Sequence, residues 1–517
     1  MTRVKQLYRR RGRGLSSFLL SLAIAALALA HAPATSGFRD QVAPATPGDS
    51  EQQKPGNTET QAETKISPEE AKELFQDVDA ILKFASLDTD LPIKKEVKRR
   101  LTTREEVVSY LEKNMKEDKD TERLRRSERV LKKFGLLPTE FDLGGFLVKL
   151  LREQVAGYYD AKTKTVNLLD WIGPEQQRPV MAHELTHALQ DQSFGLEKWM
   201  KKGDIDLDRK KNPTAEDIER DEDSEARQAV VEGQAMVVLV DYMLAPTGKS
   251  LLSSPQIAAA LTEGMMAGTS DSPAFQSAPI FLKESLTFPY RYGLDFEAEL
   301  LRSGGKQKAF AAAFTSPPLT TREIMEPKTY LSGERLEPVP LPDFKRDFHN
   351  YERFDIGAMG EFDVAILLDQ YASPEVSREL YPRWRGGYYY AVQPKGNPAA
   401  PLGLLYWSRW SDGESAARFA AIYAKQLTVR YKQVHEAPPP EATSTGVGTE
   451  QPPPSPRPTI PDLSNLVSLT GSHTWLTSEG PIVIRVQQER VLVTESLDQS
   501  TSGLVEQELM GSPTVIP

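Results

Sequence analysis

The sequence predicts a mixed α+β fold, and three patterns along its 517 residues support this prediction. Apolar side chains recur at helical spacing in residues 178–193 and again in residues 223–244. Two short segments, residues 157–160 and 165–169, are joined by a turn and predict a β-hairpin just before the first of these helices. Strand-like segments return near the C-terminus, and the chain is long enough for two or three domains.

The first 32 residues have the three-part pattern of a secretory signal peptide. Basic residues come first, an apolar run follows in residues 15–30, and Ala30-His31-Ala32 matches the A-x-A cleavage pattern. The alternative is an uncleaved membrane anchor, but this run of 16 residues is shorter than the roughly 20 that a spanning helix needs. We therefore expect a secreted or periplasmic protein whose residues 33–66 form a disordered leader.

Composition excludes several classes of partner and of site. The net charge is −10 and the isoelectric point is about 5.4, so no electrostatic feature favours a nucleic-acid partner. The chain has no cysteine, which excludes disulfides, thiolate metal sites, cysteine nucleophiles and a lipid-anchored N-terminus. Histidine and carboxylate side chains would therefore have to hold any metal.

The ordered part of the chain is expected to begin at Ser67, where Ser67 and Glu70 form a capping box around Pro68. We expect a first domain over residues 67–340 and a second over residues 345–517. The elements expected before the hairpin are a helix to about residue 86, a strand in residues 91–102, one or two helices in residues 103–134 ended by Gly135, and a helix in residues 141–155.

Residues 178–193 contain His183, Glu184 and His187 in the pattern H-E-x-x-H. On a helix, residues four apart share a face with roughly 5–6 Å between their Cβ atoms, which suits two imidazoles that bind one Zn²⁺. Glu184 would lie beside this pair as the general base for a metal-activated water. Pro179 is expected in the first turn of the helix. The chain has only 6 histidines, and because two fall in this pattern we prefer a zinc site to unrelated surface residues.

A catalytic zinc needs a third protein ligand, and the spacing that would supply a third histidine is absent. Glu232 lies in the otherwise apolar part of residues 223–244, where a carboxylate rarely lacks a partner, so we predict it as the third ligand. Glu225 is the alternative ligand, an acceptor for a ligand histidine, or a solvent-facing acid. The small residues Gly233 and Ala235 predict that this helix lies close to the H-E-x-x-H helix.

These motifs resemble those of the Glu-zincin metallopeptidases. H-E-L-T-H-A-L-Q-D-Q from His183 and V-E-G-Q-A around Glu232 are similar to a widespread group of secreted bacterial proteins, as are F-P-Y-R-Y-G and P-P-L-T-T-R-E-I further on. The resemblance covers roughly residues 135–330. It implies a zincin-like core that hydrolyses peptide bonds of a polypeptide substrate, with one zinc on His183, His187 and Glu232. The G-x-M-E-N exopeptidase motif is absent, so the expected type is an endopeptidase.

The resemblance also implies a residue that stabilises the developing oxyanion. In Glu-zincins a tyrosine or histidine after the ligand helix has this role. Tyr290 and Tyr292 are the residues expected here, and His349 is the alternative; an aromatic packing turn is the competing explanation for the two tyrosines. Glu326 occupies a position where the group often has histidine.

The hairpin offers a place for the substrate. An exposed edge of residues 157–160 would pair with an extended substrate backbone and hold the scissile carbonyl near the metal. Tyr158 and Tyr159 are expected to pack rather than to act in catalysis.

The second domain is expected to be a small α+β unit with a disordered Pro-rich insertion at residues 436–461. Aromatic residues at 388–390 and 406–410 indicate the core of a sheet rather than a ligand site. The expected elements are helices in residues 361–371 and 414–431 and strands in residues 387–393, 402–409, 474–476, 481–489 and 491–495.

The sequence thus predicts a secreted zinc metallopeptidase with Glu184 as its general base. The alternative is a non-catalytic protein that keeps this fold as an extracytoplasmic binding or assembly module. Contact with a membrane is expected only through an uncleaved signal segment. Three possible metal ligands and an intact base favour the enzyme.

Overall fold

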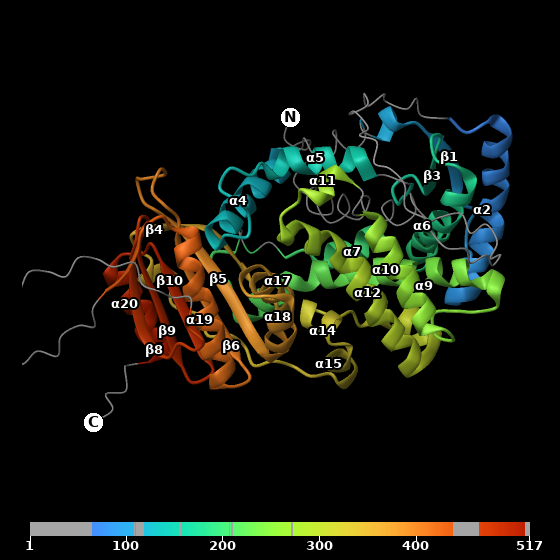
Figure 1. The fold of residues 1–517 in the computed structure, drawn as a ribbon. Helices are drawn as coiled ribbons and strands as arrows, with labels where there is room; N and C mark the ends of the chain where they lie inside the picture. The colour runs from blue at the N-terminus through green and yellow to red at the C-terminus, as the bar shows by residue number, and fades with distance from the viewer. Residues whose placement is uncertain are drawn as a thin grey trace, which may run out of the picture.

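The chain has a mixed α+β fold with two sheets, as predicted (Figure 1). The predictions for the signal peptide, for residues 33–64 of the leader and for residues 438–461 lie outside the described residues. The computed structural model describes residues 65–107, 109, 118–154, 157–205, 207, 210–269, 272–437 and 465–511.

The first part of the chain is mainly helical and contains a sheet of three strands in the order β1-β3-β2. β1 is parallel to β3 and β2 is antiparallel to it, so β2 lies at an edge, as expected of the hairpin. The strands are β1 (Lys98–Thr102), β2 (Tyr158–Asp160) and β3 (Thr165–Leu169). The longer helices are α2 (Pro68–Thr89), α4 (Asp118–Phe134), α5 (Leu143–Gln154), α6 (Pro174–Phe194), α7 (Leu196–Gly203), α9 (Asp223–Leu244), α10 (Pro255–Thr269) and α12 (Ile280–Lys306). Shorter helices are α8 (Ala215–Glu219), α11 (Pro273–Gln276), α13 (Ala313–Thr315), α14 (Thr321–Met325) and α15 (Pro327–Ser332).

The predicted start of α2 is confirmed. The Ser67 N–H donates to Glu70 Oε2 at 2.6 Å, and the Glu70 N–H donates to Ser67 Oγ at 3.2 Å, which completes the capping box. The leader was expected to reach residue 66, and this is wrong at its end. The Ile66 N–H donates to the Asp170 carbonyl at 2.8 Å, which joins the chain to the end of β3.

α9 is the central helix of the first part. Its residues 226–240 are all buried, because α6 and α12 pack against it from different sides. Within the part of the chain that the structure describes, one helical run, Ala215–Thr247, is long and apolar enough to cross a membrane. That run includes α9, and 72% of its apolar window is buried inside the protein, as in a core helix.

Two glycines determine how closely α9 and α12 approach. A Cβ added to Gly233 would lie 2.2 Å from the Gly293 carbonyl oxygen, and one added to Gly293 would lie 2.3 Å from the Ala229 carbonyl oxygen. α9 does pack against α6, as predicted, but the expectation that Gly233 makes this approach possible is wrong. Successive residues of a helix point in different directions. Gly233 therefore lies against α12, whereas the preceding residue, Glu232, faces α6.

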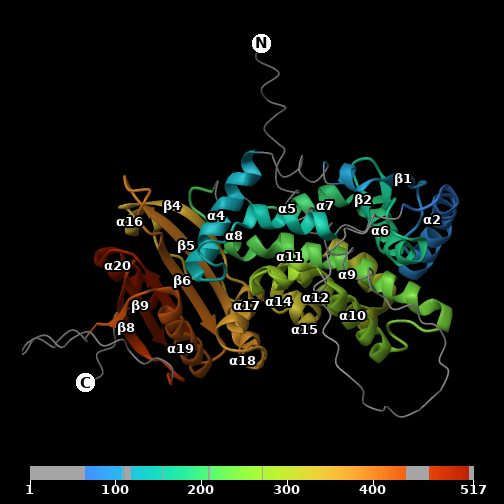
Figure 2. The ribbon, with the colours of Figure 1, turned by 45° about the horizontal axis from the view of Figure 1, so that its top comes forward.

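The second part of the chain forms an antiparallel sheet in the order β4-β5-β6-β10-β9-β8-β7. Figures 1 and 2 show this sheet at one end of the molecule and the small sheet at the other. Its strands are β4 (Tyr351–Ala358), β5 (Trp384–Pro394), β6 (Gly403–Trp410), β7 (Val434–Glu436), β8 (Gly471–Thr477), β9 (Gly480–Gln487) and β10 (Arg490–Glu495). The accompanying helices are α16 (Phe344–Asp347), α17 (Glu361–Tyr371), α18 (Pro374–Leu380), α19 (Gly413–Arg430) and α20 (Gln499–Met510).

Both faces of this sheet are covered. Tyr406 packs in the cluster that contains Phe419 of α19, whereas Trp407 packs in the cluster that contains Val505 of α20. Successive residues of a strand point to opposite faces, so the two helices cover opposite sides. The aromatic residues are core residues, as predicted, since Tyr388 and Tyr406 are fully buried. The Pro-rich segment was expected to begin at residue 436, but Glu436 belongs to β7 and pairs with Trp475.

Candidate metal centre

The H-E-x-x-H helix begins four residues earlier than predicted. α6 starts at Pro174 after the N-cap Gly173, so Pro174 takes the first-turn position that was predicted for Pro179. Pro179 instead lies inside α6, where its missing N–H leaves one helical carbonyl without its usual donor. Gln177 holds this end of the helix against β3, because its side chain exchanges two hydrogen bonds of 2.9 Å with the Leu169 backbone.

Helices α6 and α9 bring His183, His187 and Glu232 together. The Nε2 atoms of the two histidines lie 3.1 Å apart. Glu232 Oε2 lies 3.1 Å from His183 Nε2 and 3.5 Å from His187 Nε2. The three side chains are 1%, 12% and 3% exposed in the order His183, His187 and Glu232, so little water competes for these atoms.

These separations fit a metal site. Four ligands placed tetrahedrally at 2.0–2.1 Å from a zinc ion lie about 3.3 Å from one another, and the three observed separations are 3.1, 3.1 and 3.5 Å. Side-chain ligand atoms of His183, Glu184 and His187 also all lie within 4.8 Å of one another. This group could therefore hold a metal ion.

Glu184 lies beside the ligand atoms but has a different partner. Its Oε2 accepts a hydrogen bond of 2.7 Å from the Tyr159 N–H of edge strand β2. Burial raises the pKa of Glu184, while the nearby His187 and His183 act to lower it. A carboxyl with a raised pKa, next to a metal site and held by one backbone donor, is suited to accept and release a proton.

Strand β2 is less available to a substrate than we expected. The Tyr159 N–H is taken by Glu184, and the Tyr158 and Tyr159 side chains are only 6% and 4% exposed. Both tyrosines pack, as predicted. The Tyr159 hydroxyl also donates to Asp191 Oδ2 at 2.9 Å, so this strand is attached to α6 at two points.

Opposite charges face each other in the ligand group. Burial lowers the pKa of His187, but the charge of Glu232 and its hydrogen bond outweigh burial and raise this pKa to about 9. Burial raises the pKa of Glu232, but the two histidines outweigh it and lower this pKa to about 2. Glu232 is therefore an ionised carboxylate at neutral pH, the form in which a glutamate binds a metal.

Tyr290 is the predicted tyrosine that reaches this group. Its ring lies 6.2 Å from the His183 ring, nearly parallel to it, and the residue is 1% exposed. Burial raises its pKa well above the ordinary value, and the charges of Glu232 and Glu184 and a hydrogen bond with Glu232 raise it further. The phenol therefore keeps its proton and can donate a hydrogen bond.

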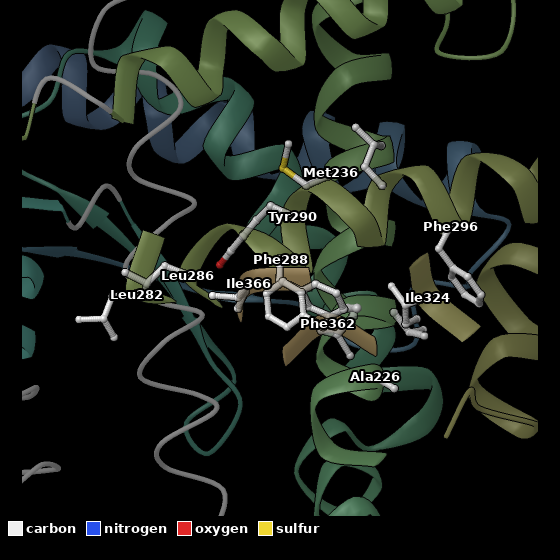
Figure 3. Packing of buried hydrophobic residues seen from close by; sticks show 14 of the residues in the cluster. Ala226, Met236, Leu282, Leu286, Phe288, Tyr290, Phe296, Ile324, Phe362 and Ile366 are labelled. Carbon is white, nitrogen blue, oxygen red and sulfur yellow. The ribbon is translucent and has the colours of Figure 1, made fainter. Parts of the chain in front are cut away.

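Tyr292 does not reach the group, and its predicted place in the site is wrong. Two residues further along α12, it points elsewhere, with its ring 5.4 Å from Phe288 and 6.3 Å from Phe362. Figure 3 shows Phe288 and Tyr290 leaving α12 in different directions, with Phe288 against Phe362. His349 is also elsewhere: it precedes β4, and its Nδ1 lies 3.2 Å from the Arg346 carbonyl oxygen.

Glu225 lies about 10 Å along α9 from Glu232, as expected for seven residues of helix. Its neighbours are carboxyl groups rather than histidines. Burial raises its pKa well above the ordinary value, and the charges of Asp363, Glu222 and Asp221 raise it further. Glu225 therefore belongs to a group of acids between α9 and α17, and the expectation that it reaches a ligand histidine is wrong.

This group of acids should make stability depend on pH. Burial raises the pKa of Glu222, hydrogen bonds from Thr321 oppose the rise, and the result is about 8, compared with 4.5 ordinarily. Between these values the folded chain holds a proton that the unfolded chain has lost. The stabilisation is complete below pH 4.5 and is lost as the pH rises through 8. We expect Glu222 to lower the free energy of unfolding by about 3–4 kcal/mol between pH 5 and pH 8.

Urea unfolding at several pH values tests this expectation. Glu222→Gln should have a flatter dependence on pH than the wild-type chain, while Glu352→Gln, at an exposed position of β4, should follow the wild type. Equal slopes for the wild type and Glu222→Gln would contradict the assignment.

Glu326 is not part of the metal centre. It forms an ion pair of 3.1 Å with Arg322 and lines a cavity of about 520 Å³. The lining of this cavity includes none of the metal-centre residues. Its members are Asp295, Glu299, Arg302, Glu326, Pro327, Lys328 and Thr329.

Two buried glutamines that were not predicted from the sequence lie behind the ligand group, and one of them contacts a ligand. Gln190 Oε1 lies 2.9 Å from His187 Nδ1, and Gln234 lies 2.9 Å from Gln190. Two features of the sequence could have indicated Gln190. It follows His187 by three residues on the same helix, and it is a polar residue on a buried face.

No family model, curated protein or solved structure matches this chain. We therefore infer the function from the residues and geometry of the metal centre.

Proposed function

We propose that this protein is an extracytoplasmic zinc metallopeptidase with a zincin-like core and a Glu-zincin ligand set. His183, His187 and Glu232 would hold one zinc ion, Glu184 would be the general base, and a polypeptide would be the substrate. The observation that carries the proposal is the triangle of ligand atoms with sides of 3.1, 3.1 and 3.5 Å, beside a second, separately held carboxylate, that of Glu184. The signal-like N-terminus supports a location outside the cytoplasm.

When bound, zinc supplies Lewis-acid activation of water and of the substrate carbonyl. Residues of the chain transfer the proton, orient the base and stabilise the developing negative charge. Glu184 takes a proton from the attacking water at a carboxylate oxygen and gives it to the leaving amine. The Tyr159 N–H orients Glu184 through its 2.7 Å hydrogen bond. The neutral Tyr290 hydroxyl donates to the carbonyl oxygen as negative charge develops there.

One observation favours the alternative, a metal-holding module without catalysis. The ligand side chains are no more than 12% exposed, so a substrate needs some local opening to reach them. Cleavage of an unfolded protein substrate distinguishes the two functions. Zinc binding without cleavage of any polypeptide would favour the non-catalytic module.

The third ligand can be tested directly. Glu232→Gln removes the carboxylate charge between the histidines, and we expect zinc affinity to fall at least about 100-fold, with loss of cleavage. Glu225→Gln is the same change on the same helix, outside the ligand group, and should bind zinc like the wild type. Chelator competition and metal analysis measure both. Equal zinc affinity in Glu232→Gln and the wild type, or loss of zinc in Glu225→Gln alone, would overturn the ligand assignment.

Tyr290→Phe should lower kcat by about 10² to 10³-fold and leave zinc affinity unchanged, because it removes one donor to the developing oxyanion. Tyr292→Phe is the matched control, since its hydroxyl lies outside the group, and its kcat should remain within about twofold of the wild type. Steady-state kinetics on a quenched peptide substrate measures both. An unchanged kcat in Tyr290→Phe would remove this residue from the mechanism.

A further inference from the structure

The Nδ1 atoms of the two histidines, His183 and His187, have different surroundings. His183 Nδ1 is buried and has no hydrogen-bond partner among the residues that the structure describes. His187 Nδ1 lies 2.9 Å from Gln190 Oε1. A histidine that offers Nε2 to a metal carries its proton on Nδ1, so its partner at Nδ1 has to be an acceptor.

The orientation of the Gln190 amide is determined by its other contacts. Its Nε2 donates to the Val231 carbonyl oxygen at 3.0 Å and to Gln234 Oε1 at 2.9 Å. A backbone carbonyl oxygen can only accept, so Nε2 has to face Val231. Gln190 Oε1 therefore faces His187 as an acceptor.

The Gln234 amide is oriented in the same way. Its Nε2 donates to the Ala309 carbonyl oxygen at 2.7 Å, which leaves Gln234 Oε1 to accept from Gln190. The hydrogen bonds thus run in one direction, from the His187 N–H through Gln190 and Gln234 to Ala309. Both glutamines are fully buried, so water cannot easily replace these contacts.

The hydrogen bonds from His187 through Gln190 and Gln234 to Ala309 form a relay, and this relay also connects one proposed ligand to another. Val231 and Gln234, which accept from Gln190, lie on either side of Glu232 on α9. Gln190 thereby connects the position of His187 on α6 to the position of Glu232. We propose that Gln190 and Gln234 are positioning residues that keep His187 in the Nδ1–H form and place its Nε2 toward Glu232. The inference rests on the proposed metal centre.

Substitution of Gln190 is the decisive test. Gln190→Met keeps a similar volume but removes the acceptor, and we expect zinc affinity to fall about 10- to 100-fold, which is the usual effect of losing an outer-sphere partner. Gln234→Met should have a smaller effect, about threefold to tenfold, because Val231 still orients Gln190. Gln192→Met is the matched control on the same helix, where the Gln192 side-chain amide is bonded to exposed backbone of Lys94 and Lys95.

A second measurement does not need zinc. In metal-free chain labelled with ¹⁵N-histidine, the His187 Nδ1–H resonance should exchange slowly with solvent in the wild type and in Gln192→Met. It should exchange quickly in Gln190→Met. Assignment comes from loss of the signal in His187→Gln. Thermal melting of every variant separates this effect from general destabilisation. If Gln190→Met fails to fold, Gln190→Glu keeps the acceptor, and its Nδ1–H signal should persist.

The outcomes separate the relay from the proposed function. Unchanged zinc affinity in folded Gln190→Met, or a His187 Nδ1–H that exchanges as slowly there as in the wild type, would overturn the relay. A wild-type chain that binds no zinc would overturn the proposed function, and the exchange measurement alone would then decide the relay.

Discussion

Glu184→Gln should lower the rate of peptide cleavage by about 10² to 10⁴-fold while the protein keeps its zinc. The amide has nearly the shape of the carboxylate but cannot accept a proton from water. It is not expected to weaken metal binding, because Glu232 rather than Glu184 lies between the two Nε2 atoms. The measurements are metal content per chain and cleavage of an unfolded protein substrate.

Glu175→Gln provides the control for this variant. It makes the same change on the same helix, at an exposed position in the first turn, and should leave cleavage unchanged. If Glu184→Gln still cleaves at the wild-type rate, Glu184 is not the base. If the variant loses zinc, Glu184 is a ligand, and the roles of Glu184 and Glu232 would have to be exchanged.

Gly233→Ala should strongly destabilise the core of the first part of the chain. The new Cβ would lie 2.2 Å from the Gly293 carbonyl oxygen, and backbone atoms of a helix cannot move aside as a flexible side chain can. Separation of α9 and α12 would be required, at a cost of about 3 kcal/mol or more. Because Glu232 is the preceding residue and Tyr290 lies on α12, the same shift should also lower kcat.

Gly264→Ala is the matched control, since nothing lies within 4 Å of a Cβ added to this residue of α10. Alanine is the better helix former, so this variant should be more stable than the wild type by about 0.5–1 kcal/mol. Denaturant unfolding of both variants measures the contrast. A Gly233→Ala protein as stable as the wild type would show that the close approach of the two helices is not required.

Much of the secondary structure was predictable because its signals are local. The predicted range of α9 agrees with the observed Asp223–Leu244, and the capping box at Ser67 marks the start of α2. Strand β4 was missed because its burial does not alternate and its pairing is interrupted between Arg353 and Asp355. Helix α20 was missed because its sequence, QSTSGLVEQELM, has few apolar residues, and its face is defined only by the sheet beneath it.

By itself, the sequence determined the helix that carries His183, Glu184 and His187, because residues four apart share a face on any α-helix. It also indicated Glu232, because a carboxylate in an apolar helix needs a partner. Only the tertiary structure decided which residues meet across helices. It placed Tyr290 rather than Tyr292 beside Glu232, turned Gly233 toward α12, and set Gln190 behind His187. Such contacts depend on how helices cross, and the spacing of residues along a single chain segment contains no information about that.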